Sequence, residues 1–200
     1  MSKLEIIIAS TRPGRVGPSV GRWVERQALA HGGFDEVEVV DLAEVNLPFM
    51  NEPHHPRLRK YTHQHTKDWS AKISEADAFV FVMPEYNYGY NAELKNAIDY
   101  LNAEWHYKAV GLVSYGGVAA GTRAAQMIKQ VLSALRMTPV LDSVSIPFIA
   151  QFLDENRVLV PNEIMLGAST AMFDELVKVT ESLRPLREAT RARLEPVPVS

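Results

Sequence analysis

The chain contains no cysteine among its 200 residues. This absence excludes disulfides, thiolate nucleophiles and cysteine-ligated iron–sulfur clusters, so any redox chemistry needs a borrowed cofactor. An excess of one charge is also missing, because the formal net charge is −3, and nucleic acid is therefore not expected as a partner. No apolar run approaches the roughly 18 residues that span a bilayer, and the opening letters MSKLEIIIAS lack a secretory apolar region. We expect a cytoplasmic protein with no membrane partner.

Short apolar runs alternate with segments of helical periodicity along the chain. The runs that predict buried strands are LEIIIA (4–9), VEVVDL (37–42), AFVFVM (78–83), AVGLVS (109–114) and the weaker PVLDSVSI (139–146). Apolar residues spaced three and four apart predict helices near 20–28, 69–76, 94–101 and 124–135. This order predicts an α/β protein with an open, doubly wound parallel sheet and a ligand crevice at the carboxyl ends of the strands.

The length fits one domain, which we expect to cover residues 1–200. The last periodic stretch, at about 163–193, predicts a long helix that is interrupted near Pro185 and followed by a short Pro-rich tail.

The loop after the first strand combines hydroxyl groups, glycines and arginines. Its sequence is STRPGRVGPS, residues 10–19, and it leads into the first predicted helix. Backbone N–H groups at a helix N-terminus bind anions, and guanidinium groups add charge-assisted hydrogen bonds, so this loop is predicted to hold a phosphate. The alternative is a plain turn in which Ser19 caps the helix and the arginines are merely solvated.

A dinucleotide fingerprint is only weakly present. Gly14, Gly17 and Gly21 are spaced G-x-x-G-x-x-x-G, which misses the G-x-G-x-x-G pattern, although Asp41 ends the second strand where such a fold holds a ribose. The loop also lacks the Gly-Lys-Ser/Thr of a Walker loop. A dinucleotide-binding fold stays an alternative at this point.

The loops after the third and fourth strands are rich in tyrosine, asparagine and glycine. They read PEYNYGYN (84–91) and SYGGVAAGTR (114–123). In a mononucleotide fold both would lie near the phosphate loop, where tyrosine faces and the amides of Asn87 and Asn91 suit a flat heteroaromatic ring. The alternative is that the tyrosines only pack and the glycines only form turns.

Together these motifs resemble the NADPH-dependent FMN reductase family of flavodoxin-like flavoproteins. The resemblance rests on SxR at 10–12, PEYN at 84–87 with LKNAIDYL at 94–101, and SYGG with GTRA at 114–124. It covers about residues 4–139 and implies a flavodoxin-like sheet in the order 2-1-3-4-5. The sequence departs from the family at Arg15, where serine is frequent, and at 88–91, where Gly-Ser-x-Pro is frequent.

The resemblance implies FMN as cofactor and NADPH or NADH as co-substrate. The residues that it implies for the FMN phosphate are Ser10, Thr11, Arg12, Arg15, Val16, Gly17 and Ser19. Those that it implies for the isoalloxazine are Pro84, Glu85, Tyr86, Asn87 and Tyr88 at one edge, and Ser114, Tyr115, Gly116 and Gly117 at the other. No residue is assigned as a catalytic acid or base, and no metal ligand is expected.

The implied reaction passes hydride from a reduced nicotinamide through FMN to a small acceptor such as a flavin, a quinone or an azo compound. The implied assembly is a homodimer or a dimer of dimers, with FMN near the subunit boundary. The alternative function is a flavodoxin-like electron carrier or an FMN-binding sensor without turnover. Arg15 is a candidate for the 2′-phosphate of NADPH if Arg12 binds FMN.

Two other clusters carry weaker hypotheses. The histidines at 54, 55, 63 and 65 fall in an irregular, Pro-containing segment whose spacing does not suit a metal, so a lid or dimer contact is the hypothesis there. Residues 105–107, Trp-His-Tyr, are either exposed at an interface or substrate site or packed in the core.

Overall fold

The five predicted strands form a single parallel sheet in the computed structural model, which describes residues 2–194. The strands are β1 (Lys3–Ile8), β2 (Glu36–Asp41), β3 (Ala78–Pro84), β4 (Ala109–Tyr115) and β5 (Thr138–Ile146). Their order is β2-β1-β3-β4-β5. The flavodoxin-like prediction is therefore confirmed. Every residue of the central strands β3 and β4 is buried, which explains why their sequences are apolar without alternation.

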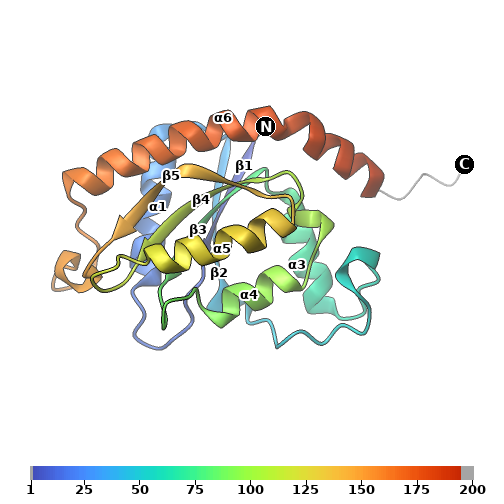
Figure 1. The fold of residues 1–200 in the computed structure, drawn as a ribbon, viewed down its shortest axis with the longest axis horizontal. Coiled ribbons are helices and arrows are strands. Elements are labelled where there is room, and N and C mark those ends of the chain that lie inside the picture. Colours follow the sequence, from blue (N-terminus) through green and yellow to red (C-terminus); the bar gives the residue numbers. More distant parts are fainter. Residues whose placement is uncertain (1, 195–200) are drawn as a thin grey trace, which may run out of the picture.

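Helices cover both faces of this sheet (Figure 1). The α-helices are α1 (Gly17–His31), α2 (Leu42–Val45), α3 (Gln64–Glu75), α4 (Ala92–Asp99), α5 (Thr122–Ala134) and α6 (Glu163–Leu194). Short 3₁₀ helices are η1 (Pro56–Leu58), η2 (Ala103–Trp105) and η3 (Ile149–Phe152). No helix within residues 2–194 is both long and apolar enough to cross a bilayer.

Alternating side chains of the strands build one core on each face. On β1, Leu4 and Ile6 belong to the core that α1 and α6 cover, and Ile7 belongs to the core beneath α3, α4 and α5. Parallel strands end together, so the loops after β1, β3 and β4 emerge at one end of the sheet, at the lower left of Figure 1. The fold thus brings the three predicted site loops to one place.

The helix α6 runs through Pro185 without the interruption predicted there. A proline inside a helix removes one backbone donor, and here side chains beyond it tie the two halves together. The Arg187 guanidinium donates to the Thr180 carbonyl at 3.1 Å and to Asp77 Oδ1 at 2.9 Å. Burial alone would raise the pKa of Asp77, but the Lys3 N–H and the Arg187 guanidinium help to hold that pKa below its usual value. The predicted Pro-rich tail, residues 195–200, lies outside the described residues.

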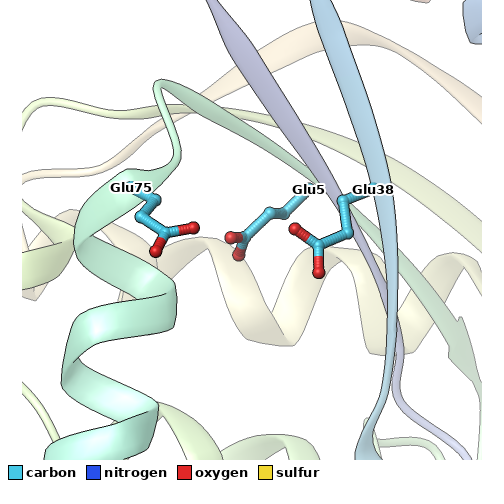
Figure 2. Close-up of side chains that lie close together, drawn as sticks. All are labelled: Glu5, Glu38 and Glu75. Atoms are coloured by element: carbon cyan, nitrogen blue, oxygen red, sulfur yellow. The ribbon is translucent and has the colours of Figure 1, made fainter.

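An acidic cluster lies at the opposite end of the sheet from the three loops. Figure 2 shows the Glu5 carboxylate between those of Glu38 and Glu75, and one oxygen of each lies within 4.8 Å of the others. Lys3 Nζ lies 2.7 Å from a Glu38 oxygen and 2.9 Å from a Glu75 oxygen, and Lys72 Nζ lies 2.7 Å from the other Glu38 oxygen. These ammonium groups stand where a metal cation would neutralise the cluster, so we assign no metal site.

Glu5 differs from its two neighbours in the cluster. Its side chain is fully buried, and neither carboxylate oxygen has a hydrogen-bond partner among residues 2–194. Burial raises the pKa of Glu5 to about 8, although the buried ammonium group of Lys108 opposes this change. Lys108 itself donates to the Ile73 carbonyl near the end of α3. Burial therefore favours the protonated form of the Glu5 carboxyl.

Candidate functional site

The loop after β1 brings the start of α1 very close to the sheet. A Cβ added at Gly17 would lie 2.2 Å from Ser10 Oγ and 3.1 Å from the Tyr115 hydroxyl, so only glycine fits there. Gly14 has φ +72°, a conformation that glycine adopts without strain. The Tyr115 hydroxyl lies 3.2 Å from Ser10 Oγ, to which it donates. The glycines of this loop thus serve close approach and a turn.

The N-terminus of α1 is available to an anion. Val16 occupies the N-cap, no side chain caps the helix, and no acidic residue lies in its first turn. Pro18 at the start removes a donor that the helix would leave unpaired in any case. The helix spans 15 residues, and its dipole favours negative charge at this end. The Ser19 N–H already donates to the Val16 carbonyl at 3.0 Å, so Gly17 supplies the remaining backbone donor of the first turn.

The two arginines of the loop have different roles. Arg15 donates to both Asp41 oxygens at 2.7 Å and to the Ser10 carbonyl at 2.6 Å. Arg12 is exposed, and its guanidinium makes no hydrogen bond or ion pair with any residue in the described range. The prediction that Arg15 meets a phosphate of FMN or NADPH is therefore not supported by its contacts, because a bidentate carboxylate already neutralises it.

Asp41, Ser19 and Asn91 are likewise committed to the fold. Asp41 also accepts from the Ala43 N–H and so caps α2, which removes it as the ribose ligand of a dinucleotide fold. Ser19 is buried and its Oγ accepts from the Leu159 N–H at 2.8 Å, so it neither caps α1 nor reaches an open surface. Asn91 is 2% exposed, and its side-chain amide donates to the Ala9 carbonyl at 2.6 Å. This bond ties the start of α4 to the end of β1, so the amide does not face a ring as predicted.

The loop after β3 is a tight, exposed hairpin turn. Tyr86 and Gly89 exchange backbone hydrogen bonds of 2.9 and 3.0 Å. The two residues between them, Asn87 and Tyr88, both have positive φ, 49° and 70°. Tyr86 and Tyr88 are 38% and 67% exposed, so the turn presents two rings and the Asn87 amide to solvent. These groups remain available to a flat ligand.

The loop after β4 is held firmly by its surroundings. The Gly116 N–H donates to the Ile146 carbonyl at 3.2 Å, and the Ser114 hydroxyl donates to the Ala120 carbonyl at 2.9 Å. Burial raises the pKa of Tyr115 to about 12. Tyr115 and Ser114 are thus buried behind the loop, whereas Gly117 is exposed at its tip.

Arg123, which the sequence reasoning did not single out, joins these two loops. Its Nε donates to Glu85 Oε1 at 2.6 Å, and its guanidinium carbon lies 3.8 Å from the centre of the Tyr88 ring. The only sequence signal was the position of this arginine in GTRA, just after the glycine-rich loop. Because Glu85 is paired in this way, it does not stand as an unpaired general base.

A cleft of about 440 Å³ lies beside the loop after β1, between α2 and the start of α4. Thr11 is the one predicted phosphate residue in its lining, and its hydroxyl donates to Glu93 at 2.8 Å. Burial acts to raise the pKa of Glu93, but hydrogen bonds from Asn91 and Thr11 outweigh it and keep that pKa low. An ionised carboxylate in the wall makes this cleft unsuitable for a phosphate, which leaves the Arg12 side of the loop.

The structure places Trp105 in the core, whereas a lid or dimer contact at the histidine segment stays a prediction. Trp105 is fully buried and donates to the Ile98 carbonyl at 3.1 Å, so it packs in the core. His63 and His65 stack with ring centres 5.1 Å apart, and each contacts Asn51. No histidine in residues 2–194 belongs to a group of three possible metal ligands.

The chain belongs to the NADPH-dependent FMN reductase family, whose model matches residues 2–151. It is 41% identical over 149 residues to an NAD(P)H-dependent FMN reductase of Schizosaccharomyces pombe, covering 72% of this chain and 74% of that protein. It is 35% identical over 155 residues to an NAD(P)H-dependent FMN reductase of Nectria sp, covering 75% and 77%. The protein is accordingly an oxidoreductase of a family that uses FMN and NAD(P)H, as the motifs implied.

Solved structures share the fold. FerB, a flavoenzyme NAD(P)H:(acceptor) oxidoreductase of Paracoccus denitrificans, superposes with a TM-score of 0.72 at 19% identity, covering 91% of this chain and 98% of that one. A flavodoxin, WrbA-like protein of Agrobacterium tumefaciens gives a TM-score of 0.59 at 15% identity, covering 91% and 99%. At these identities the likeness concerns the fold alone.

Proposed function

We propose that this protein binds FMN at the carboxyl ends of β1, β3 and β4 and transfers hydride equivalents from NAD(P)H to a small acceptor. The observation that carries the proposal is the pairing of an uncapped α1 N-terminus with an Arg12 guanidinium that has no ion-pair partner in the described part of the chain. A phosphate there would lie next to the tyrosine-bearing turn after β3. These features fit a ligand that joins a phosphate to a flat ring.

Each loop has a proposed task. The positive end of the α1 dipole, the Gly17 N–H and the Arg12 guanidinium bind the phosphate. The turn at Tyr86–Gly89 and the tip at Gly117 border the ring with aromatic faces, an amide and backbone groups. Arg15 and Ser19 keep the loop in place through Asp41 and Leu159. Bound FMN would supply the redox chemistry, so the protein's task is alignment and hydrogen bonding.

No side chain of the site needs to act as an acid or base in this proposal. Glu85 is held by Arg123, and the Tyr115 hydroxyl keeps its proton because burial raises its pKa to about 12. Tyr115 instead donates to Ser10 Oγ and stabilises the loop that holds the phosphate.

The acceptor, assembly and location are parts of the same proposal. The acceptor is a flavin or a quinone, since relatives include FMN reductases and an NAD(P)H:quinone oxidoreductase of Solanum tuberosum that is 36% identical over 99 residues. A homodimer in the cytoplasm is the proposed form. Exposed apolar side chains near the site, Phe49 at 82% and Val118 at 77%, support a subunit boundary there.

The test is flavin retention followed by anaerobic reduction. Purified protein is mixed with FMN, gel-filtered, and titrated with NADPH and, separately, NADH. Retained flavin whose absorbance bleaches supports the proposal and identifies the preferred donor. Retained flavin that stays oxidised favours an electron carrier or sensor, and absence of both retained flavin and FMN-dependent NAD(P)H oxidation rejects the site.

The phosphate assignment has its own test in two arginine variants. Arg12→Ala is expected to weaken FMN binding by about tenfold or more, since a charge-assisted contact is worth about 1.5–3 kcal/mol, and to leave riboflavin binding unchanged. Arg15→Ala is expected to weaken both ligands alike, because it acts through the shape of the loop. Equal losses for both ligands in Arg12→Ala would contradict the assignment.

A further inference from the structure

Arg123 contacts the loop after β3 and follows the loop after β4 directly in the chain, and these two loops are proposed to border the flavin ring. It is the second residue of α5, directly after the loop that follows β4. Its backbone N–H donates to Glu85 Oε2 at 3.2 Å, its Nε donates to Oε1 at 2.6 Å, and its Nη2 also pairs with Glu85. The Glu85 side chain is 7% exposed, so this pair is shielded on the carboxylate side. Arg123 therefore ties the loop after β3 to the start of α5.

The same guanidinium supports the Tyr88 ring, which stands on a strained turn. A tyrosine rarely adopts the left-handed φ of 70° seen here, and Asn87 before it has φ 49°. Such strain persists where the surroundings hold it, and it is common at functional sites. The ring is 67% exposed, and the guanidinium carbon lies 3.8 Å from its centre. A cation over the ring face is the contact that holds this exposed side chain in place.

We infer that Arg123 is a positioning residue of the flavin site, which sets the separation of the two ring-bordering loops and presents the Tyr88 ring at their edge. The inference rests on the proposed function and adds Arg123 to the residues that the resemblance implied for FMN. Planarity matters to this role because a guanidinium can stack on a ring and bind a carboxylate at once, whereas a lysine ammonium cannot do both in the same geometry.

The test measures FMN affinity, the visible spectrum of bound flavin, and kcat and KM with NADPH. The variants are Arg123→Ala, Arg123→Lys, Tyr88→Ala and the double Arg123→Ala/Tyr88→Ala. We expect Arg123→Ala to raise the FMN dissociation constant by about tenfold, to shift the flavin spectrum and to lower kcat. Arg123→Lys should keep part of the FMN affinity, because lysine can still pair with Glu85, but its flavin spectrum should remain shifted from that of the wild type. The double variant should be no weaker than Arg123→Ala, because the two residues act as one unit.

A matched control lies just beyond the other end of α5, which ends at Ala134. Arg136 also lies over a tyrosine ring, with its guanidinium carbon 5.8 Å from the centre of the Tyr107 ring and Nη1 2.9 Å from the Tyr107 hydroxyl. Arg136→Ala removes a comparable pair far from the strand ends that carry the site. It should leave FMN affinity, the flavin spectrum and kcat at wild-type values.

Two results would overturn the inference. One is an Arg123→Ala protein that matches Arg136→Ala in affinity, spectrum and kcat, and the other is a double variant whose loss equals the sum of the two single losses. If Arg123→Ala does not fold, Arg123→Lys and Tyr88→Ala are compared with Arg136→Ala in FMN affinity, flavin spectrum and kcat, and values that match Arg136→Ala overturn the inference. A wild-type protein that neither retains FMN nor oxidises NADPH would instead reject the proposed function, whereas an active wild type with an unaffected Arg123→Ala rejects this inference alone.

Discussion

Replacing Glu5 by glutamine should make the protein's stability less dependent on pH. The Glu5 carboxyl is fully buried, has no hydrogen-bond partner in the described range, and lies beside the carboxylates of Glu38 and Glu75. Its pKa in the folded protein is about 8, against an ordinary value of 4.5. The folded state therefore binds this proton more tightly than the unfolded chain does. Glutamine has nearly the same shape and nothing to ionise.

The sign and size of the effect follow from proton linkage. A carboxyl whose pKa is raised on folding leaves the unfolding free energy unchanged below about pH 4, where both states are protonated. As pH rises towards 8, the unfolded chain loses this proton first and the unfolding free energy falls. At pH 7 the raised pKa lowers the unfolding free energy by about 3–4 kcal/mol, taking about 1.4 kcal/mol for each pH unit above 4.5. The cost approaches about 5 kcal/mol above pH 8. Glu5→Gln should not show this pH-dependent loss, because glutamine does not ionise.

The assay is urea unfolding followed by tryptophan fluorescence at intervals between about pH 5 and pH 9. The quantity of interest is the difference in unfolding free energy between Glu5→Gln and wild type, in which titrating groups that do not interact with Glu5 cancel. Burial lowers the pKa of Lys108 to about 7, and because Lys108 interacts with Glu5 the two groups contribute to this difference together. Any constant loss from the amide's own unmet hydrogen bonds shifts this difference without changing its slope. Glu36→Gln is the control, because that side chain is 61% exposed and contacts the same Lys3 ammonium at 2.9 Å; it should change stability by less than about 1 kcal/mol.

A difference between Glu5→Gln and wild type that stays flat from pH 5 to pH 8 would refute the reasoning. It would mean that Glu5 titrates like an exposed glutamate, or that a cation other than Lys3, Lys72 and Lys108 neutralises it. Repeating the series with a chelator separates these cases, since a bound divalent ion would make the wild-type curve depend on chelation.

Two further predictions concern packing and a buried ion pair, and both are measured by urea unfolding. Gly17→Ala should lower the unfolding free energy by about 1–3 kcal/mol and weaken FMN binding, because the added Cβ would lie 2.2 Å from Ser10 Oγ. Its control is Gly167→Ala in α6, where the Cβ meets nothing within 4 Å, so the change should be neutral or stabilising by up to about 1 kcal/mol. Arg187→Ala should cost about 3–5 kcal/mol, because it leaves the buried Asp77 without one of its guanidinium partners, and a loss below about 1 kcal/mol would show that the pair is dispensable.

Local sequence patterns predicted the architecture well. Apolar β-branched runs and a period near 3.6 residues are properties of neighbouring residues, so strand and helix order could be read directly, and the family motifs supplied the sheet order that the structure confirms. The start of α3 at Gln64 could not be read in this way, because the residues of its first turn are all polar. The continuation of α6 past Pro185 could not be read locally either, because Arg187 beyond the proline binds Asp77, which is distant in the sequence.

The sequence by itself determined that hydroxyls, glycines, arginines and tyrosines would gather at the carboxyl ends of the strands. Tertiary structure alone decided which of them remain available: Arg15 is taken by Asp41, 26 residues away, whereas Arg12 is not paired within residues 2–194. It also joined Glu85 to Arg123 across 38 residues. The physical reason is that the composition of a loop is a property of neighbouring residues in the sequence. An ion pair forms only where the packing of separate elements brings two charged groups within reach.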